Sequence, residues 1–186
     1  MPKYDDTRIH SLAALLEDRA RNSPDVLYGI FPDATITYRQ LFARARAVAK
    51  GLLADGLAPG EHVAVLMPNC LEYLVAHYAI QLAGGVSVLV NSRFKQHELA
   101  HAIADSDSCM VITTDAVDEH VDFADLLDRT FQELASARTP EFSPVAKAPK
   151  PRRLVLFGTN NWDAAVSEAA LVQARQAISD TDLAAC

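Results

Sequence analysis

Two histidines four residues apart form the most recognisable set of metal-binding side chains in this chain. The segment from His97 to His101 reads His-Glu-Leu-Ala-His and fits the pattern H-E-x-x-H. On a helix, histidines at this spacing lie one turn apart and can share a zinc ion, while the glutamate activates a water molecule. A small zinc hydrolase that uses His97, Glu98 and His101 is therefore one hypothesis for this chain.

The residues that follow this pair do not supply an obvious third metal ligand. Asp107 stands where one class of zinc protease has its third histidine, and Ala104 stands where that class has a glycine. Glu119 could serve as the ligand of another class, but nothing distinguishes it from the other acidic residues. The third ligand that a zinc hydrolase needs is not marked in the sequence.

Helical periodicity offers a second explanation of the same segment. At 100° per residue, Leu99, Ala102 and Ile103 would form a buried stripe. The polar residues of the segment would share the opposite face: His97, Glu98, His101 and Asp105. This pattern is typical of a helix with one solvated face, so we expect no metal there.

These residues contain no recognisable motif for binding nucleotide phosphates. Backbone N–H groups of a glycine-rich loop and a lysine commonly hold nucleotide phosphates. The seven glycines form neither G-x-G-x-x-G nor G-x-x-x-x-G-K; they are Gly29, Gly51, Gly56, Gly60, Gly84, Gly85 and Gly158. The sequence therefore predicts that this chain does not bind ATP tightly by itself.

Composition and charge exclude several classes of function. The 186 residues are 50% hydrophobic and 22% charged, as in ordinary globular proteins. A net charge of −7 disfavours a nucleic-acid partner, which requires a basic surface. The three cysteines have no metal-ligand spacing, and no apolar run approaches the length of a membrane span. We expect a cytoplasmic protein with no membrane span.

Strands that alternate with helices predict how these residues are positioned. After a short helix at 11–21 and a hairpin around Pro32-Asp33, apolar strands are expected at 62–67, 86–90, 109–113 and 154–157. Helices are expected from Thr37 to Gly56, from Asn69 to Gly84, and at 96–104, 118–134 and 164–177. Such alternation predicts an α/β fold with a mostly parallel sheet.

Capping residues and prolines mark the boundaries of these elements. Ser11 should cap the first helix, Thr37 and Gln40 should form a capping box, and Asn69 with Glu72 should cap the third helix. We expect one partial domain over 1–186, with a core at 1–135. Four prolines between 136 and 153 predict a linker, and a strand and a helix should occupy 154–186.

The order of these motifs resembles the start of the AMP-forming acyl-CoA synthetases, a branch of the adenylate-forming superfamily. The family features are a Thr-Tyr helix start, a Gly-x-x-Pro-Gly turn, a strand ending in Pro-Asn, a Gly-Gly turn and an Asn-x-Arg. They correspond here to Ile36–Leu41, Gly56–Asn69, Ala83–Arg93 and Glu98–His101. Ser92, Glu61 and His62 depart from the usual family residues.

This resemblance implies the N-terminal portion of a ligase that uses ATP, Mg²⁺ and coenzyme A. Such an enzyme joins a carboxylic acid to ATP as an acyl-adenylate, and then forms a CoA thioester. By the same resemblance Arg93, with Lys95 beside it, would lie near the CoA nucleotide, where a cation offsets phosphate charge. The identity of the acid, including fatty, aryl and amino acids, stays open.

The family motifs that carry catalysis are missing from these residues. They include the Ser/Thr/Gly-rich phosphate loop, a Tyr-Gly-x-Thr-Glu motif and a C-terminal catalytic lysine. We therefore expect no catalytic residue here and no activity from this chain alone, which could be truncated or a degenerate copy. A non-catalytic α/β interaction module is a further alternative, and an exposed sheet edge could cause self-association.

Overall fold

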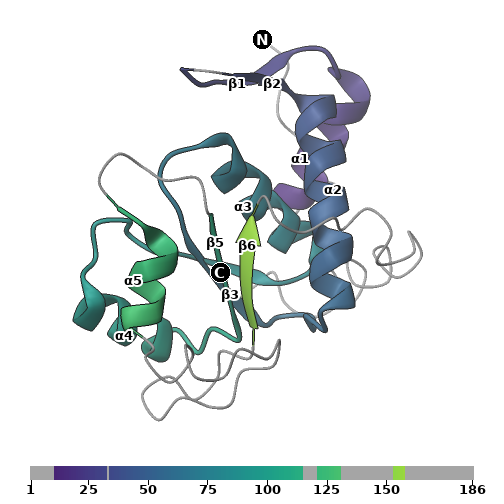
Figure 1. The fold of residues 1–186 in the computed structure, drawn as a ribbon. Helices are drawn as coiled ribbons and strands as arrows, with labels where there is room; N and C mark the ends of the chain where they lie inside the picture. Colours follow the sequence, from purple (N-terminus) through teal and green to yellow (C-terminus); the bar gives the residue numbers. More distant parts are fainter. Residues whose placement is uncertain (1–10, 33, 115–120, 131–152, 158–186) are drawn as a thin grey trace.

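A four-stranded parallel sheet forms the centre of the molecule (Figure 1). The computed structural model describes residues 11–32, 34–114, 121–130 and 153–157. The strands are β3 (His62–Leu66), β4 (Val86–Leu89), β5 (Met110–Thr114) and β6 (Arg153–Phe157). Their order is β4-β3-β5-β6, and every pairing is parallel. The predicted α/β fold with a parallel sheet is confirmed.

The strand β3 lies between β4 and β5, so successive strands are added first on one side of β3 and then on the other. Val63 of β3 is in register with Ser87 of β4 on one side and with Met110 of β5 on the other. The chain passes from β3 to β4 on one side and then crosses to β5 on the opposite side. The loops after β3 and β5 therefore lead away from each other, which opens space beyond the strand ends.

Helices cover both faces of the sheet because the strands are apolar on both sides. Along β3, Val63 and Val65 belong to one buried cluster, while Ala64 and Leu66 belong to the other. The helices α1 (Leu12–Asn22), α2 (Tyr38–Ala54) and α3 (Leu71–Ala83) contribute to the first cluster. The helices α4 (Gln96–Asp105) and α5 (Phe123–Thr130) contribute to the second. Strands of this kind are typical of parallel sheets buried on both faces.

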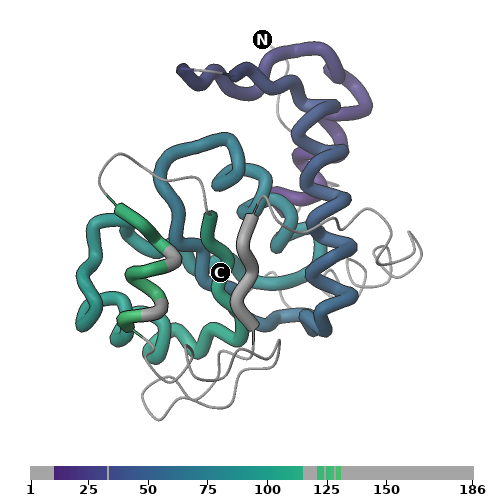
Figure 2. Tube along the Cα trace, in the orientation of Figure 1, coloured from purple at the N-terminus to yellow at the C-terminus, as the bar shows by residue number. Residues whose placement is uncertain are grey.

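The N-terminal hairpin extends from the three layers, as the trace in Figure 2 shows. It pairs β1 (Leu27–Ile30) with β2 (Thr35–Thr37) in antiparallel fashion. Tyr28 anchors the hairpin through a 3.0 Å hydrogen bond between its hydroxyl and that of Tyr78 on α3. The two rings also pack edge to face, a favourable geometry for aromatic pairs.

Two of the three predicted helix caps are confirmed. The Ser11 hydroxyl accepts the Ala14 N–H at 3.1 Å, and the Thr37 hydroxyl accepts the Gln40 N–H at 3.3 Å. The Gln40 side chain in turn accepts the Thr37 N–H at 3.0 Å, which completes the capping box. These contacts satisfy backbone donors that the first turn of each helix leaves unpaired.

The third cap was predicted wrongly, and so was the start of one helix. Cys70, not Asn69, occupies the N-cap position of α3, and its side chain makes no capping bond. The last helix on the second face begins at Phe123, not at 118, because Asp122 accepts the Asp125 N–H at 2.9 Å. That bond makes Asp122 the residue where the helix starts.

Some predictions fall outside the described residues. Of the linker expected at 136–153, only Arg153 is described, and it is the first residue of β6. The helix expected at 164–177 lies outside the described residues. Within the described ranges, no helix is both long and apolar enough to span a membrane.

Candidate functional site

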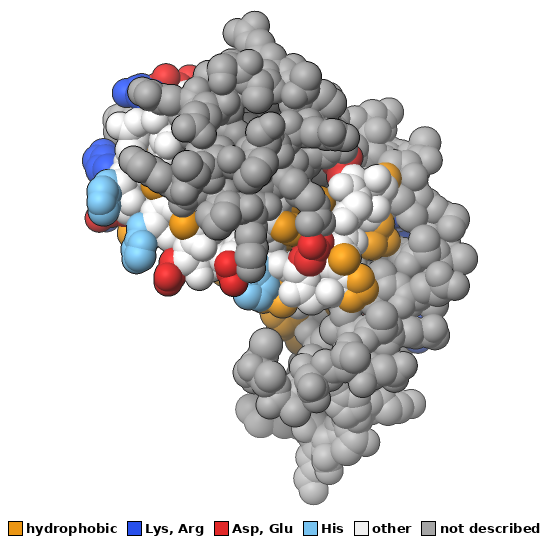
Figure 3. All heavy atoms as spheres, turned by 90° about the horizontal axis from the view of Figure 1, so that it is seen from below, with side chains coloured by type: hydrophobic (Ala, Val, Ile, Leu, Met, Phe, Trp, Pro, Cys, Tyr) orange, Lys and Arg blue, Asp and Glu red, His pale blue; other side chains and the backbone are white. Residues whose placement is uncertain are grey.

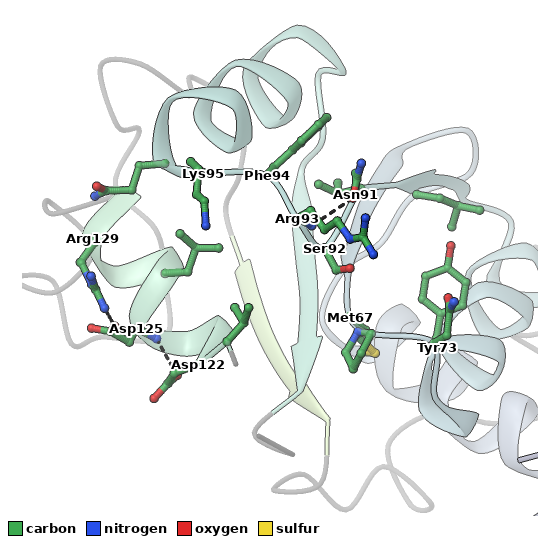
Figure 4. Close-up of a pocket in the computed structure, with 17 residues that line it drawn as sticks. Met67, Tyr73, Asn91, Ser92, Arg93, Phe94, Lys95, Asp122, Asp125 and Arg129 are labelled. Carbon is green, nitrogen blue, oxygen red and sulfur yellow. Dashed lines mark hydrogen bonds and ion pairs between the residues drawn. The ribbon is translucent and has the colours of Figure 1, made fainter. Parts of the chain in front are cut away.

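A groove of about 1270 Å³ lies where β3 and β4 end (Figure 4). Met67, Pro68 and Asn69 follow β3 into the groove, and Leu89 at the end of β4 continues into the segment 90–96. Tyr73 of α3 lines one side, and residues along the length of α5 line the other. In open α/β sheets, ligands bind beyond the carboxyl ends of the strands where the strand order reverses. This groove lies beyond the carboxyl ends of the strands, bounded by the segments that follow β3 and β4 and by α5, the helix after β5.

Two side-chain bonds shape the loop between β4 and α4. The Asn91 side-chain oxygen accepts the Arg93 N–H at 3.0 Å, which forms a tight turn. The Glu98 carboxylate accepts the Lys95 N–H at 2.9 Å and thereby caps the N-terminus of α4. The backbones of Arg93 and Lys95 are thus each fixed by a hydrogen bond to a side chain.

Arg93 and Lys95 give the groove exposed positive charge. Both residues are exposed and line the groove, and neither forms an ion pair with a described residue. The opposite wall is different, because Arg129 there is paired with Asp125 (Figure 4). An unpaired arginine can bind a phosphate through two parallel N–H groups, and a lysine adds a point charge. The groove is therefore suited to an anionic group.

Tyr73 supplies a neutral hydrogen-bonding group to the same groove. Partial burial raises the pKa of the Tyr73 phenol above its ordinary value of 10.0. The phenol therefore keeps its proton at neutral pH and can both donate and accept a hydrogen bond. The Tyr73 ring lies at the side of the groove in Figure 4.

The structure separates the two histidines from the groove. His97 and His101 are exposed on α4, and neither lines the groove. The Glu98 carboxylate, which would activate water in a zinc hydrolase, instead caps α4. Among the described residues no group of three or more His, Cys, Asp or Glu side chains could hold a metal ion. Glu119, the other ligand considered above, lies outside the described residues.

Only some residues of the groove could be predicted from the sequence. Arg93 and Lys95 were predicted, and both lie in the segment that follows β4. Tyr73 was not predicted, because helical periodicity alone does not distinguish it from other residues of the helix. Asp122 and Asp125 carried a usable signal, since an acidic residue three positions before another is a common helix start.

Comparison with known proteins identifies the family. The fold and the groove define an α/β protein with a groove beyond the strand ends, the position where open α/β sheets commonly bind ligands. The family model described as "AMP-binding enzyme" matches residues 16–184. The chain belongs to this family, and the predicted relation to adenylate-forming enzymes is confirmed.

Sequence relatives of this chain have names that describe CoA ligases. YngI of Bacillus subtilis (strain 168), named as an acyl-CoA synthetase, is 34% identical over 164 residues, which cover 83% of this chain and 30% of YngI. A 2-succinylbenzoate–CoA ligase of Oceanobacillus iheyensis is 37% identical over 102 residues, which cover 54% of this chain and 21% of that protein. The chain thus spans less than a third of the length of these relatives.

Solved structures share the fold. A Mycobacterium tuberculosis fatty acyl CoA synthetase matches with a TM-score of 0.62 and 25% identity, over 92% of this chain and 29% of that one. The O-succinylbenzoate coenzyme A synthetase of Bacillus subtilis, solved in complex with AMP, matches with a TM-score of 0.53 and 28% identity. That match covers 61% of this chain and 32% of the synthetase.

Proposed function

We propose that this chain is the N-terminal portion of an AMP-forming acyl- or aryl-CoA ligase. The full-length enzyme would activate a carboxylic acid in two steps. First, the carboxylate oxygen attacks the α-phosphorus of ATP, which forms the acyl-adenylate and releases pyrophosphate. Second, the CoA thiolate attacks the acyl carbon and AMP leaves. The family match over 16–184, together with CoA ligase names among the relatives, supports this assignment.

Arg93 and Lys95 have a specific role in this proposal. Their exposed charges in the groove would bind phosphate groups of coenzyme A during the second step. The groove fits this role because Arg93 and Lys95 have no ion-pair partner among the described residues and can therefore bind phosphate. Arg129 on the opposite wall, in contrast, is already paired with Asp125. Tyr73 would add a hydrogen bond from the side of the groove. CoA supplies the attacking thiol, and these residues only position it.

The 186 residues alone should not complete either step. They contain no glycine-rich phosphate loop of the kinds considered above. Electrostatic stabilisation of phosphate charge is the main source of catalysis in phosphate chemistry. Among the described residues of the groove, only Arg93 and Lys95 are cations without an ion-pair partner. We propose that ATP, Mg²⁺ and the acid bind chiefly to other parts of the full-length enzyme.

Reading the gene downstream of Cys186 tests the assignment directly. We expect an open frame that encodes a strand followed by a Ser/Thr/Gly-rich loop with a lysine. A stop codon directly after Cys186 would contradict the assignment. Independently, the 186-residue chain should show no ATP–pyrophosphate exchange with a panel of fatty, aryl and amino acids. Exchange above the rate of a heat-denatured sample would show that the chain is active alone.

Kinetics of the longer protein test the role of Arg93. Arg93→Ala should raise the KM for CoA about ten- to a hundredfold, because a charge-assisted hydrogen bond contributes about 1.5–3 kcal/mol. The same variant should leave ATP–pyrophosphate exchange unchanged, since exchange reports only the first step. Arg129→Ala is the matched control on the opposite wall and should change neither quantity. A KM for CoA that Arg93→Ala does not alter would remove Arg93 from this role.

A further inference from the structure

The exposed face of α4 has a feature that the proposed function does not use. His97 and His101 lie on this face, outside the groove, and neither imidazole hydrogen-bonds to a described residue. Figure 3 shows histidine side chains at the molecular surface on the face seen from below. By contrast, the His62 Nδ1 donates a 2.6 Å hydrogen bond to the Ser106 carbonyl, and the His77 Nδ1 is buried.

Packing of α4 fixes the direction of both histidines. Leu99 and Ile103, two and six positions after His97, are fully buried against the sheet. A helix anchored on that side must present positions 97 and 101 to solvent. The Glu98 carboxylate secures the first turn by accepting the Lys95 N–H at 2.9 Å. The pair is therefore held on a regular helix and not on a loop.

Helix geometry brings the two imidazoles within reach of one ion. A rise of about 1.5 Å per residue separates positions four apart by about 6 Å along the axis, on the same face. Imidazole nitrogens bind zinc at about 2.0–2.1 Å, so two rings at this spacing can converge on a single ion. Neutral imidazole also suits copper and nickel.

We propose that His97 and His101 form a two-ligand surface site for a divalent transition ion, with water as the remaining ligands. The site takes imidazole-binding ions, with Cu²⁺ bound more tightly than Ni²⁺ or Zn²⁺ according to the usual order of divalent affinities. It is not a hydrolytic centre, because the described residues supply no third ligand and Glu98 caps the helix. Metal binding at this site requires α4 to be helical, so the ion stabilises the folded chain.

Calorimetric titration of the tag-free protein with NiCl₂ tests the site. The wild type should bind one Ni²⁺ ion at this pair, and the midpoint of thermal unfolding should rise with Ni²⁺ concentration. His97→Ala or His101→Ala should each weaken this binding about tenfold or more, because one of two imidazole ligands is lost. The four other histidines remain present in both variants.

Asp105 allows a control that changes spacing without changing the number of histidines. Asp105 is exposed on α4, four positions after His101 and eight after His97. The double variant His97→Ala/Asp105→His therefore has histidines four apart and should recover binding. The double variant His101→Ala/Asp105→His has them eight apart, about 12 Å along the axis, and should not.

Each outcome of this comparison decides the proposal. Recovery in the first double variant but not in the second would establish a helical two-histidine site. Equal Ni²⁺ affinity in the wild type and both single variants would overturn the proposal. Equal affinity of the two double variants would also overturn it, because binding would then not depend on helical spacing.

Discussion

Gly85 lies in a tight junction between α3 and β4, where a side chain has no room. A Cβ there would stand 3.0 Å from Ile80 Cγ2 and 3.1 Å from both the Glu61 carbonyl oxygen and Leu57 Cδ2. The Gly85 N–H also donates to the Ile80 carbonyl at 2.8 Å, which holds the backbone in place. A glycine is required here because the neighbouring atoms lie too close to leave room for a Cβ.

Substitution of Gly85 should reveal this constraint. Gly85→Ala should lower the free energy of unfolding by about 1–3 kcal/mol, the usual cost of overpacking. Urea denaturation followed by circular dichroism measures the change. Gly56→Asn is the control, because Gly56 has positive φ but open space around it, and asparagine tolerates that conformation. A Gly85→Ala variant as stable as the wild type would show that the junction can expand.

His77 makes stability depend on pH. Burial lowers the pKa of the His77 imidazole below its ordinary value of 6.5, and its Nδ1 has no hydrogen-bond partner among the described residues. The unfolded chain therefore takes up this proton at higher pH than the folded chain. The stability that comes from the neutral ring is present above about pH 6.5 and is lost as the pH falls through the folded pKa.

Replacement of His77 by a side chain that does not titrate tests this dependence. Between about pH 7.5 and 5.5, the wild type should lose more free energy of unfolding than His77→Gln. Carboxylates titrate alike in both proteins, so the difference reports His77. Urea denaturation at several pH values measures it. Parallel pH dependence in the two proteins would exclude a contribution from this ring.

A capping box stabilises the start of α2. Thr37 and Gln40 satisfy each other's backbone N–H groups and connect β2 directly to the helix. Thr37→Ala should cost about 1 kcal/mol of stability, as is typical for loss of an N-cap. Thr37→Ser, which keeps the hydroxyl, should remain close to the wild type. Chemical denaturation compares them, and an equal loss in both variants would assign the effect to the lost methyl group.

Elements with a strong local signal were predicted well from the sequence. The capping box and the glycine stop near Gly56 depend on neighbouring residues alone, so the sequence contains them in full. Leu12 shows the limit: helical spacing predicts that it shares the buried face with Leu16, but it is 43% exposed, and Ala13 occupies the buried position. Which side of a short helix is buried depends on its packing partners, here α2 and α3.

The candidate site could be predicted only in part, because it also depends on contacts between elements that are distant in the sequence. Arg93 and Lys95 follow a strand directly, and the family resemblance marked them. Tyr73 enters the groove from α3, and Arg129 enters from α5. Their proximity depends on the strand order β4-β3-β5-β6, which alternation of strands and helices does not specify.

At the scale of the whole molecule, the edge of the sheet at β4 is open among the described residues. Only β3 pairs with β4 there, and Leu89 at its end is 49% exposed. An uncovered edge with apolar side chains favours pairing between chains. We therefore expect the 186-residue chain to self-associate reversibly through β4, as the sequence also suggested.

A charge on this edge should reduce self-association. In sedimentation velocity, Leu89→Lys should shift the population towards monomer, because lysine on an edge opposes strand pairing. Leu12→Lys is the matched control, since Leu12 is similarly exposed at 43% but lies on α1. A similar effect of both variants would indicate general apolar association, and a monomeric wild type would contradict the prediction outright.

The central position of β3 also affects how the chain folds as it leaves the ribosome. Val63 meets Ser87 once the next strand has been synthesised, but it meets Met110 only after α4 has emerged. During that interval the apolar β3 has one side without a partner strand. Nascent chains with unpaired strand edges are prone to aggregate and are typical clients of chaperones. The central position of β3 therefore leaves this strand paired on one side only for part of its synthesis.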